Sequence, residues 1–165
     1  MPDPHASPAD LIRAVTLGVG RLVTGGMNEP QQAALLDELA GYYAEYTDVR
    51  HPFAPLGDTP LRTRQELRNH FADAVIQSRS AGEIEFAPSD MTVHQTADPE
   101  VVIVEFSYRG SASGQRFELP CIYVVRARGG EIIESRDYGH HVESTRVFGG
   151  LGNLAAALAN RATRA

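Results

Sequence analysis

Apolar residues recur at helical spacing in the first segment of the chain. In residues 8–24 the series is Ile12, Val15, Val19, Leu22 and Val23, which forms one face of a helix. The preceding "SPAD" is typical of a helix start, because Ser7 can cap the first turn and Pro8 suits the first helical position. The segment "TGGMNEP" then predicts a break and a second helix. The broad apolar face of that second helix is predicted to hold Leu35, Leu36, Leu39, Tyr42, Tyr43 and Tyr46.

A third helix is predicted after residue 63. There "TRQE" has the pattern of a capping box, with Thr63 as the cap and Glu66 reaching back to it. Between the second and third helices lies "TDVRHPFAPLGDTPL", residues 47–61, which has no regular period. We interpret it as a short edge strand that ends in a rigid loop, because its prolines restrict the chain. The loop either holds His51 at the mouth of a pocket or only frames that mouth.

The period changes in the second half of the chain. Strand-like alternation in "EIEFAPSDMTVHQT", "EVVIVEFSYRG", "QRFELPCIYVVRA" and "EIIESRDYGHHVE" predicts four strands in an antiparallel meander. The Ala-rich tail predicts a helix over residues 153–163, with Asn153 as its cap. Helices followed by long antiparallel strands indicate an α+β fold, in which a curved sheet over helices encloses a cone with an open mouth. We predict one domain over residues 1–165, with residues 8–24 as an extension and residues 31–145 as the core.

The composition and net charge of the chain argue against nucleic acids and membranes as partners. Of the 165 residues 42% are hydrophobic, and the formal net charge is −6, so the chain lacks the basic surface that nucleic acids or anionic membranes require. No apolar run reaches the roughly 18 residues of a membrane span, and no basic segment precedes the apolar N-terminal stretch. We therefore expect a soluble, cytoplasmic protein without a signal peptide. The single cysteine, Cys121, is either a small buried hydrophobe or a nucleophile with an activating base.

Three stretches make the chain similar to a known group of proteins. They are "HPFAPLGDTPLRTRQELRNHF", "VVIVEFSYRGSASGQRFELPCIYVVRARGGEII" and "ESRDYGHH". Together they resemble the nuclear transport factor 2-like superfamily, in its SnoaL-like and ketosteroid isomerase-like branch. The resemblance implies a cystatin-like α+β roll, a cone-shaped barrel with helices packed in the concave face of a curved, mostly antiparallel sheet. It is specific for the fold rather than for the reaction, because one fold hosts many functions.

The resemblance also implies roles for three residues. His51 falls where ketosteroid isomerases keep a proton-shuttling Asp, and Tyr123 falls where they have an acidic oxyanion donor. Asp137 falls where limonene-epoxide hydrolases and SnoaL cyclases hold a catalytic Asp. The epoxide hydrolases also need an Arg and a second Asp on the preceding strands. Those places look like Phe106 and Tyr108 here, which counts against epoxide opening.

These residue types suit general acid–base chemistry. Burial in an apolar cone raises the pKa of an Asp, and a His has an ordinary pKa of about 6.5, close to neutrality. A Tyr hydroxyl, from Tyr123 or Tyr42, can donate to a developing enolate. We therefore predict an isomerase or cyclase without cofactor or metal, acting on a small apolar carbonyl compound of steroid or polyketide type. The candidate substrate contacts are Tyr42, Tyr46, Phe53, Phe71 and Cys121.

Each candidate also has a structural interpretation. His51 can cap the proline-rich turn, and Asp137 can form an ion pair with a neighbouring Arg. Either face of the last strand can look inward, and a bulge would exchange the two faces. The adjacent His140 and His141 suggest a metal, but neighbouring residues of a strand point to opposite faces, so we predict no metal site.

A second hypothesis is a non-catalytic ligand-binding or assembly module of the same fold, and epoxide hydrolysis is a weaker third. Under either of the first two hypotheses we expect a homodimer, because the open face of the sheet would otherwise expose apolar residues. The candidates on that face are Phe106, Tyr108, Ile122 and Val124.

Overall fold

The computed structural model describes residues 5–79 and 81–163. The elements follow in the order α1 (Pro8–Thr24), α2 (Glu29–Gly41), β1 (Tyr43–Arg50), β2 (Leu61–Thr63), α3 (Arg64–Arg79), β3 (Ile84–Gln95), β4 (Val101–Ala112), β5 (Gln115–Arg128), β6 (Glu131–Gly139), α4 (His141–Val147) and α5 (Leu151–Ala162). The strands form one sheet in the order β2-β1-β6-β5-β4-β3. The β1–β6 pairing is parallel and the other pairings are antiparallel, which confirms a mostly antiparallel sheet in an α+β fold.

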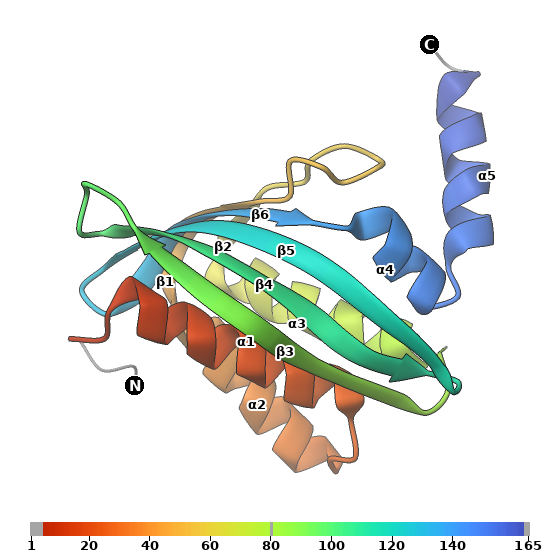
Figure 1. Ribbon diagram of the computed structural model, residues 1–165, viewed down its shortest axis with the longest axis horizontal. Helices are drawn as coiled ribbons and strands as arrows, with labels where there is room; N and C mark the ends of the chain where they lie inside the picture. Colours follow the sequence, from red (N-terminus) through yellow and green to blue (C-terminus); the bar gives the residue numbers. More distant parts are fainter. Residues whose placement is uncertain (1–4, 80, 164–165) are drawn as a thin grey trace.

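The sheet is curved and does not close, and α1, α2 and α3 lie on one side of it (Figure 1). Helix α1 runs along the edge strand β3, a position that the sequence left open. Thr24 exchanges hydrogen bonds of 3.1 Å with the backbone of Phe86. Gly20 permits this close approach, because a Cβ there would lie 3.0 Å from the Phe86 carbonyl oxygen.

Alternation along the strands separates a buried face from an outer face. In β4 the inward residues are Val102, Val104, Phe106 and Tyr108, and in β5 they include Phe117, Leu119, Cys121 and Val125. The prediction that Phe106 and Tyr108 lie on the open face is therefore wrong. They are 4% and 6% exposed, and their rings pack edge-to-face at 5.1 Å inside the cone. Ile122 does lie on the outer face and is 45% exposed.

The predicted helix starts are confirmed by their capping contacts. The Asp10 amide donates to the Ser7 hydroxyl, and the Asp10 carboxylate accepts from the Ser7 amide and hydroxyl. The Glu66 amide donates to the Thr63 hydroxyl, and the Glu66 carboxylate accepts from the Thr63 amide. These local polar contacts fix where the helices begin, which is why the sequence pattern located them correctly.

Three boundaries differ from the prediction. Helix α2 ends at Gly41, so Tyr43 and Tyr46 belong to strand β1 rather than to its apolar face. Strand β6 ends at Gly139, and His140 caps a short additional helix by accepting from the Glu143 amide. Asn153 lies inside α5, which begins at Leu151. The two edge strands of the sheet are β3 and β2, and β2 begins at the last residue of the proline-rich segment. The strand that opens this segment is the end of β1, which lies between β2 and β6, so its prediction as an edge strand is wrong.

Helix α5 stands away from the rest of the molecule (Figure 1). It has no buried residue, and Leu151 and Leu158 are 43% and 40% exposed. Its tip is held where Arg161 donates to the carbonyl oxygen of Leu56. Within the described part of the chain, none of the helices is both long enough and apolar enough to cross a bilayer.

Candidate active site

Asp137 is directed into the cone from strand β6. A bulge in β6 sets this direction: Arg126 pairs with Glu134, whereas its neighbour Ala127 pairs with Ile132, so one residue of β6 is extra. Because of that insertion, Ser135 and Asp137 face inward together with Ile132. The Asp137 residue is only 9% exposed, and its carboxylate accepts a short hydrogen bond from the Ser135 hydroxyl.

The environment of Asp137 favours its neutral form. Burial is the main cause and raises the pKa of Asp137 to about 7, although the Ser135 hydrogen bond and the positive charge of Arg136 act in the opposite direction. Arg136 does not pair with Asp137. Its guanidinium donates to the backbone and the carboxylate of Asp48 instead, at 2.9 and 3.0 Å. The interpretation of Asp137 as a structural ion pair with its neighbouring Arg is therefore wrong.

His51 approaches Asp137 from the adjacent strand. β1 pairs in parallel with β6 so that Val49 lies beside Ser135, which brings the residue after β1 level with Asp137. His51 Nε2 lies 4.0 Å from Asp137 Oδ2. The turn that follows is held by the backbone of His51, whose amide donates to Asp58 and whose carbonyl accepts from Ala54. The turn thus engages the main chain of His51, and the imidazole is directed toward the carboxylate.

Two further imidazoles surround His51. Its ring centroid lies 5.0 Å from that of His70 on α3 and 5.9 Å from that of His141 on α4. Desolvation, followed by the charges of His70 and His141, lowers the pKa of His51 to about 4, while Asp58 opposes the shift. Since the pKa of Asp137 is raised and that of His51 is lowered, we interpret the 4.0 Å contact as a neutral imidazole beside a neutral carboxyl group below a pH of about 7, rather than as a salt bridge.

Hydroxyl and thiol groups lie around Asp137 on the concave face. Tyr123 is its direct cross-strand neighbour on β5. Burial, with a smaller contribution from the Asp137 charge, raises the pKa of Tyr43, Tyr108 and Tyr123, so each keeps its proton at neutral pH. The same two effects raise the pKa of Cys121 to about 12. Cys121 is thus a thiol at neutral pH, which disfavours its role as a nucleophile.

A groove of about 510 Å³ opens at the histidines. It is lined by His51, Ala54, Gly57, Thr59, Pro60, Leu61, Glu66, Asn69, His70, Asp73 and His141. Its walls are the proline-rich loop, helix α3 and the start of α4. Asp137 and Tyr123 lie deeper than these lining residues, and His51 connects the two regions, since it both lines the groove and contacts Asp137.

One protein-family model matches the sequence of this chain. The model of the SnoaL-like domain matches residues 29–135. The chain belongs to the SnoaL-like domain family. None of the curated proteins compared with it matches its sequence. The family match begins at α2 and ends in β6, so α1, α4 and α5 lie outside it.

Solved structures share the fold of this SnoaL-like protein. A candidate isomerase from Bacillus subtilis has a TM-score of 0.68 at 19% identity, covering 90% of this chain and 96% of that chain. A candidate polyketide cyclase from Xanthomonas campestris has a TM-score of 0.61 at 15% identity, covering 88% and 99% of the two chains. A protein of ketosteroid isomerase-like fold from Catenulispora acidiphila has a TM-score of 0.53 at 18% identity, covering 81% and 86%. At these identities the likeness shows the fold alone.

The structure of this SnoaL-like protein brings five of the predicted site residues together. They are His51, Asp137 and Tyr123, with Cys121 and Phe71 nearby on the buried side. The Phe71 ring lies 6.1 Å from His70 and 6.2 Å from Tyr43.

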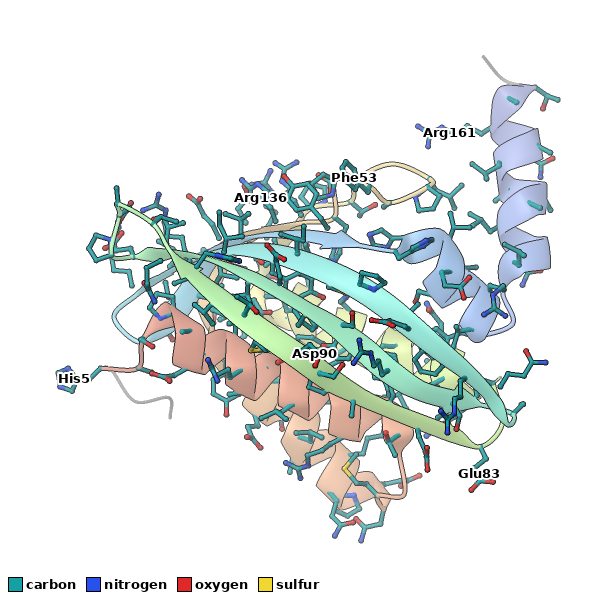
Figure 2. All side chains as sticks on the ribbon, viewed as in Figure 1. His5, Phe53, Glu83, Asp90, Arg136 and Arg161 are labelled. Atoms are coloured by element: carbon teal, nitrogen blue, oxygen red, sulfur yellow. The ribbon has the colours of Figure 1, made fainter. Side chains whose placement is uncertain are left out.

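The other three predicted contacts lie elsewhere. Tyr46 is 79% exposed. The Tyr42 hydroxyl donates to Glu38 at the surface. Phe53 is 69% exposed and packs on Tyr138, and Figure 2 shows it on the same side of the molecule as Arg136. These three residues are therefore not placed to contact a ligand in the groove.

Sequence reasoning missed five residues of this region: Tyr43, Tyr108, Ser135, His70 and His141. Tyr43 had a usable signal, because Gly41 is a typical helix end and the β-prone "YYAEYTDV" follows it. Tyr108 and Ser135 follow from the inward alternation once the buried faces of β4 and β6 are known. The grouping of His70 and His141 around His51 depends on the tertiary packing of α3 and α4, which has no local signature.

The adjacent His140 and His141, which suggested a metal, lie at the start of helix α4. His141 lies in helix α4 rather than on a strand, so the argument from opposite strand faces does not apply to it. Among the residues that the structure describes, no group of three or more His, Cys, Asp or Glu side chains is arranged to hold a metal ion.

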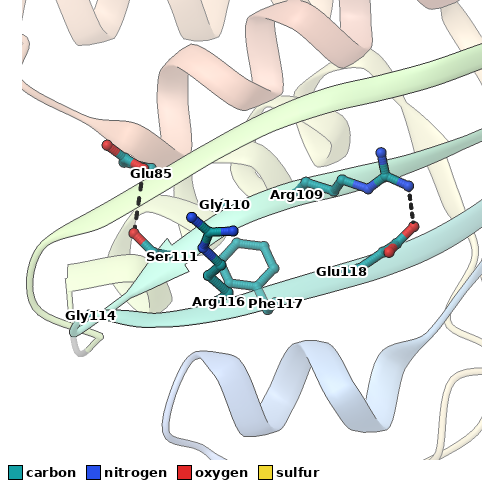
Figure 3. Close-up of a pocket in the computed structure, with 8 residues that line it drawn as sticks. All are labelled: Glu85, Arg109, Gly110, Ser111, Gly114, Arg116, Phe117 and Glu118. Atoms are coloured by element: carbon teal, nitrogen blue, oxygen red, sulfur yellow. Dashed lines mark hydrogen bonds and ion pairs between the residues drawn. The ribbon is translucent and has the colours of Figure 1, made fainter.

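A second hollow, of about 740 Å³, lies on the outer face near the β4–β5 turn (Figure 3). Its prominent charge, Arg109, is bound by Asp90 and by Glu118. Ser111 donates to Glu85 across the hollow. Arg116 also lines this hollow, and both arginines are exposed. Because the histidine groove instead adjoins a buried titratable group, Asp137, the hollow is a weaker candidate.

Proposed function

We propose that this SnoaL-like protein is an acid–base enzyme that enolises an apolar carbonyl compound, as an isomerase or a cyclase would. The observation that carries the proposal is the buried Asp137 carboxyl group, 4.0 Å from His51 and directly opposite Tyr123 on the next strand. An acid–base group works best with a pKa near the operating pH, and burial raises the pKa of Asp137 to about 7. The names of the structural neighbours, isomerase and polyketide cyclase, belong to the same reaction class.

The proposed step transfers one proton. In the basic form Asp137 is ionised and His51 is neutral. A substrate in the groove loses a proton from the carbon next to its carbonyl to His51, and that proton passes on to Asp137. The pair becomes neutral while the substrate becomes an enolate. The proposal requires the carbonyl end of the substrate to extend from the groove past His51, so that the enolate oxygen accepts a hydrogen bond from the Tyr123 hydroxyl. Return of the proton to another carbon completes an isomerisation, and attack of the enolate on a second carbonyl completes a cyclisation.

Covalent alternatives have less support. All fifteen basic residues of the sequence are arginines, so the chain offers no lysine side chain to form an imine with a carbonyl substrate. The Cys121 thiol has a pKa raised to about 12 and is a poor nucleophile. Epoxide hydrolysis would need an Arg and a second Asp near Asp137. The corresponding inward positions are occupied by Phe106 and Tyr108.

The test is exchange of substrate protons with solvent. A panel of cyclic and aromatic ketones is incubated in D₂O with the protein, and loss of the α-proton signal is followed by proton NMR. We expect catalysed exchange whose rate rises as pH increases through about 7, because the basic form needs ionised Asp137. Binding of ketones without any catalysed exchange would instead favour a non-catalytic ligand-binding module.

We further propose that the protein forms a homodimer through the outer face of its sheet. On this face Ile122 is 45% exposed, and the Phe53 ring lies 5.1 Å from that of Tyr138. Ion pairs such as Asp48–Arg136 and Arg126–Glu134 flank these apolar residues, a composition typical of an interface core with a polar rim.

Ile122→Glu is expected to convert the dimer into a monomer in light scattering coupled to gel filtration, because it places a charge in the centre of the apolar patch. Ile76→Glu is the matched control, since Ile76 is 63% exposed on α3, away from this face. A wild-type monomer at micromolar concentration, or a dimer that only the Ile76 variant disrupts, would contradict this arrangement.

A further inference from the structure

The histidine groove carries an uneven set of charges. Two carboxylates, Glu66 and Asp73, are among its lining residues, and no Arg is among the described residues that line it. Glu66 is partly engaged, because its carboxylate accepts from the backbone amides of Arg62 and Thr63. The negative charge of Asp73 opposes the burial that lowers the pKa of His70, and the Asp73 carboxylate has no hydrogen bond or salt bridge to any described residue.

Two arginines near the groove, Arg50 and Arg161, bind groups outside its lining. Arg50 pairs with Asp48 and Asp58 on the outer side of the proline-rich loop. Arg161 comes from α5 and donates to the carbonyl oxygen of Leu56, and Figure 2 shows its side chain directed toward that loop. The histidines do not supply positive charge at neutral pH, because burial lowers the pKa of His51, His70 and His141. Glu66 and Asp73 therefore supply the charge among the described residues that line the groove.

An unsatisfied atom in the same wall indicates what a ligand would offer. The Nε2 atom of His141 is buried and has no hydrogen-bond partner among the described residues. A buried polar atom without a partner is costly, so a ligand that brings a hydrogen-bond donor to this wall gains affinity. In the tautomer that carries its proton on Nδ1, the neutral His141 imidazole accepts a hydrogen bond at Nε2, and the proposal that follows uses this tautomer.

We propose that the groove selects carbonyl compounds that also carry a protonated amine, and that it rejects carboxylates and phosphates. This inference rests on the proposed function, because it assigns the substrate class of the same site. The ammonium group would lie toward Asp73 and His141, and the carbonyl-bearing part would lie toward His51, with Asp137 behind it. A phosphate-bearing carrier of acyl groups would meet no Arg among the described residues that line the groove, so we expect a free small molecule as the substrate.

Three probes of one skeleton test the charge preference. They are para-acetylbenzylamine, para-acetylbenzyl alcohol and para-acetylbenzoate, whose dissociation constants are measured by NMR titration at neutral pH. We expect the amine to bind about twofold to fivefold more tightly than the alcohol, and the carboxylate more weakly than both, since an exposed carboxylate attracts a cation modestly. The preference should shrink in high salt, because screening weakens exposed charges.

Asp73→Asn is expected to remove most of the preference for the amine and to leave the affinity for the alcohol unchanged. Asp37→Asn is the matched control, because Asp37 is an exposed carboxylate on α2 that pairs with Arg68. Binding of the carboxylate as tight as that of the amine, an amine preference that survives Asp73→Asn, or no binding by any of the three would overturn the inference. Selective amine binding without catalysed α-proton exchange would leave the ligand class standing and remove the acid–base function instead.

Discussion

Asp137→Asn is expected to lower the rate of catalysed α-proton exchange by about two to four orders of magnitude, the usual contribution of a positioned acid–base group. The amide cannot accept the proton that His51 takes from the substrate. His51 alone is a weak base, because desolvation and the two neighbouring imidazoles lower its pKa to about 4. The substitution is nearly isosteric, and the buried site retains a group that can accept from the Ser135 hydroxyl.

The measurement compares this variant with two others by proton NMR in D₂O. Asp98→Asn is the control, because Asp98 is a surface carboxylate paired with Arg126, and its exchange rate should equal that of the wild type. The exchange rate of Tyr123→Phe should lie between those of Asp137→Asn and Asp98→Asn, since this substitution removes the hydrogen-bond donor to the enolate but leaves the base in place. If Asp137→Asn kept more than about a tenth of the wild-type rate, Asp137 would not be the acid–base group.

The parts of this fold that the sequence predicted are those fixed by local chemistry. Ser7 with Asp10, and Thr63 with Glu66, form contacts within one helical turn, so their pattern is visible without tertiary structure. The meander β3–β6 is likewise joined by short connections, and its alternation is continuous along each strand. Strand β1 was predicted only from residue 47 and as an edge strand, because its neighbour in the sheet, β6, lies about 90 residues away in sequence and pairs with it in parallel.

The candidate site could be predicted only in part for a similar reason. The residue types His51, Tyr123 and Asp137 were identified from the resemblance, but the inward direction of Asp137 depends on one extra residue in β6. A shift of one residue turns every later side chain to the opposite face. Tyr46 and Phe53 were among the predicted substrate contacts, with Tyr46 predicted on the second helix. Both lie on the outside instead, since β1 and the loop expose them.

The same two titrating residues should give the stability of the protein an unusual dependence on pH. Asp137 has a folded-state pKa of about 7, above its unfolded value of 3.8, so between these values the unfolded chain binds fewer protons and stability falls as pH rises. His51 has a folded-state pKa of about 4, below its unfolded value of 6.5, so stability rises over that interval. At about 1.4 kcal/mol per pH unit, the two slopes nearly cancel from pH 4 to 6.5 in the wild type.

Single substitutions should separate the two contributions. In Asp137→Asn the free energy of unfolding should increase by about 3 kcal/mol between pH 4 and 6.5, because only the imidazole term remains, with His70 and His141 adding in the same direction. In His51→Gln the free energy of unfolding should decrease by up to about 4 kcal/mol between pH 4 and 7, because of the Asp137 carboxyl group. His70 and His141 make this decrease smaller, because their own contributions to stability rise with pH. Carboxylates with lowered pKa values, such as Asp48 and Asp58, titrate below this range and are common to all variants.

Urea denaturation at a series of pH values measures these slopes, with the double variant His51→Gln/Asp137→Asn as the control that lacks both. In the double variant, the free energy of unfolding should depend on pH nearly as it does in the wild type. The small rise with pH that remains should come from His70 and His141. An Asp137→Asn profile parallel to the wild type over this range would mean that the carboxyl group titrates normally. The gain in stability at neutral pH, together with the loss of exchange, would show that the buried carboxyl group is retained for chemistry at the expense of the fold.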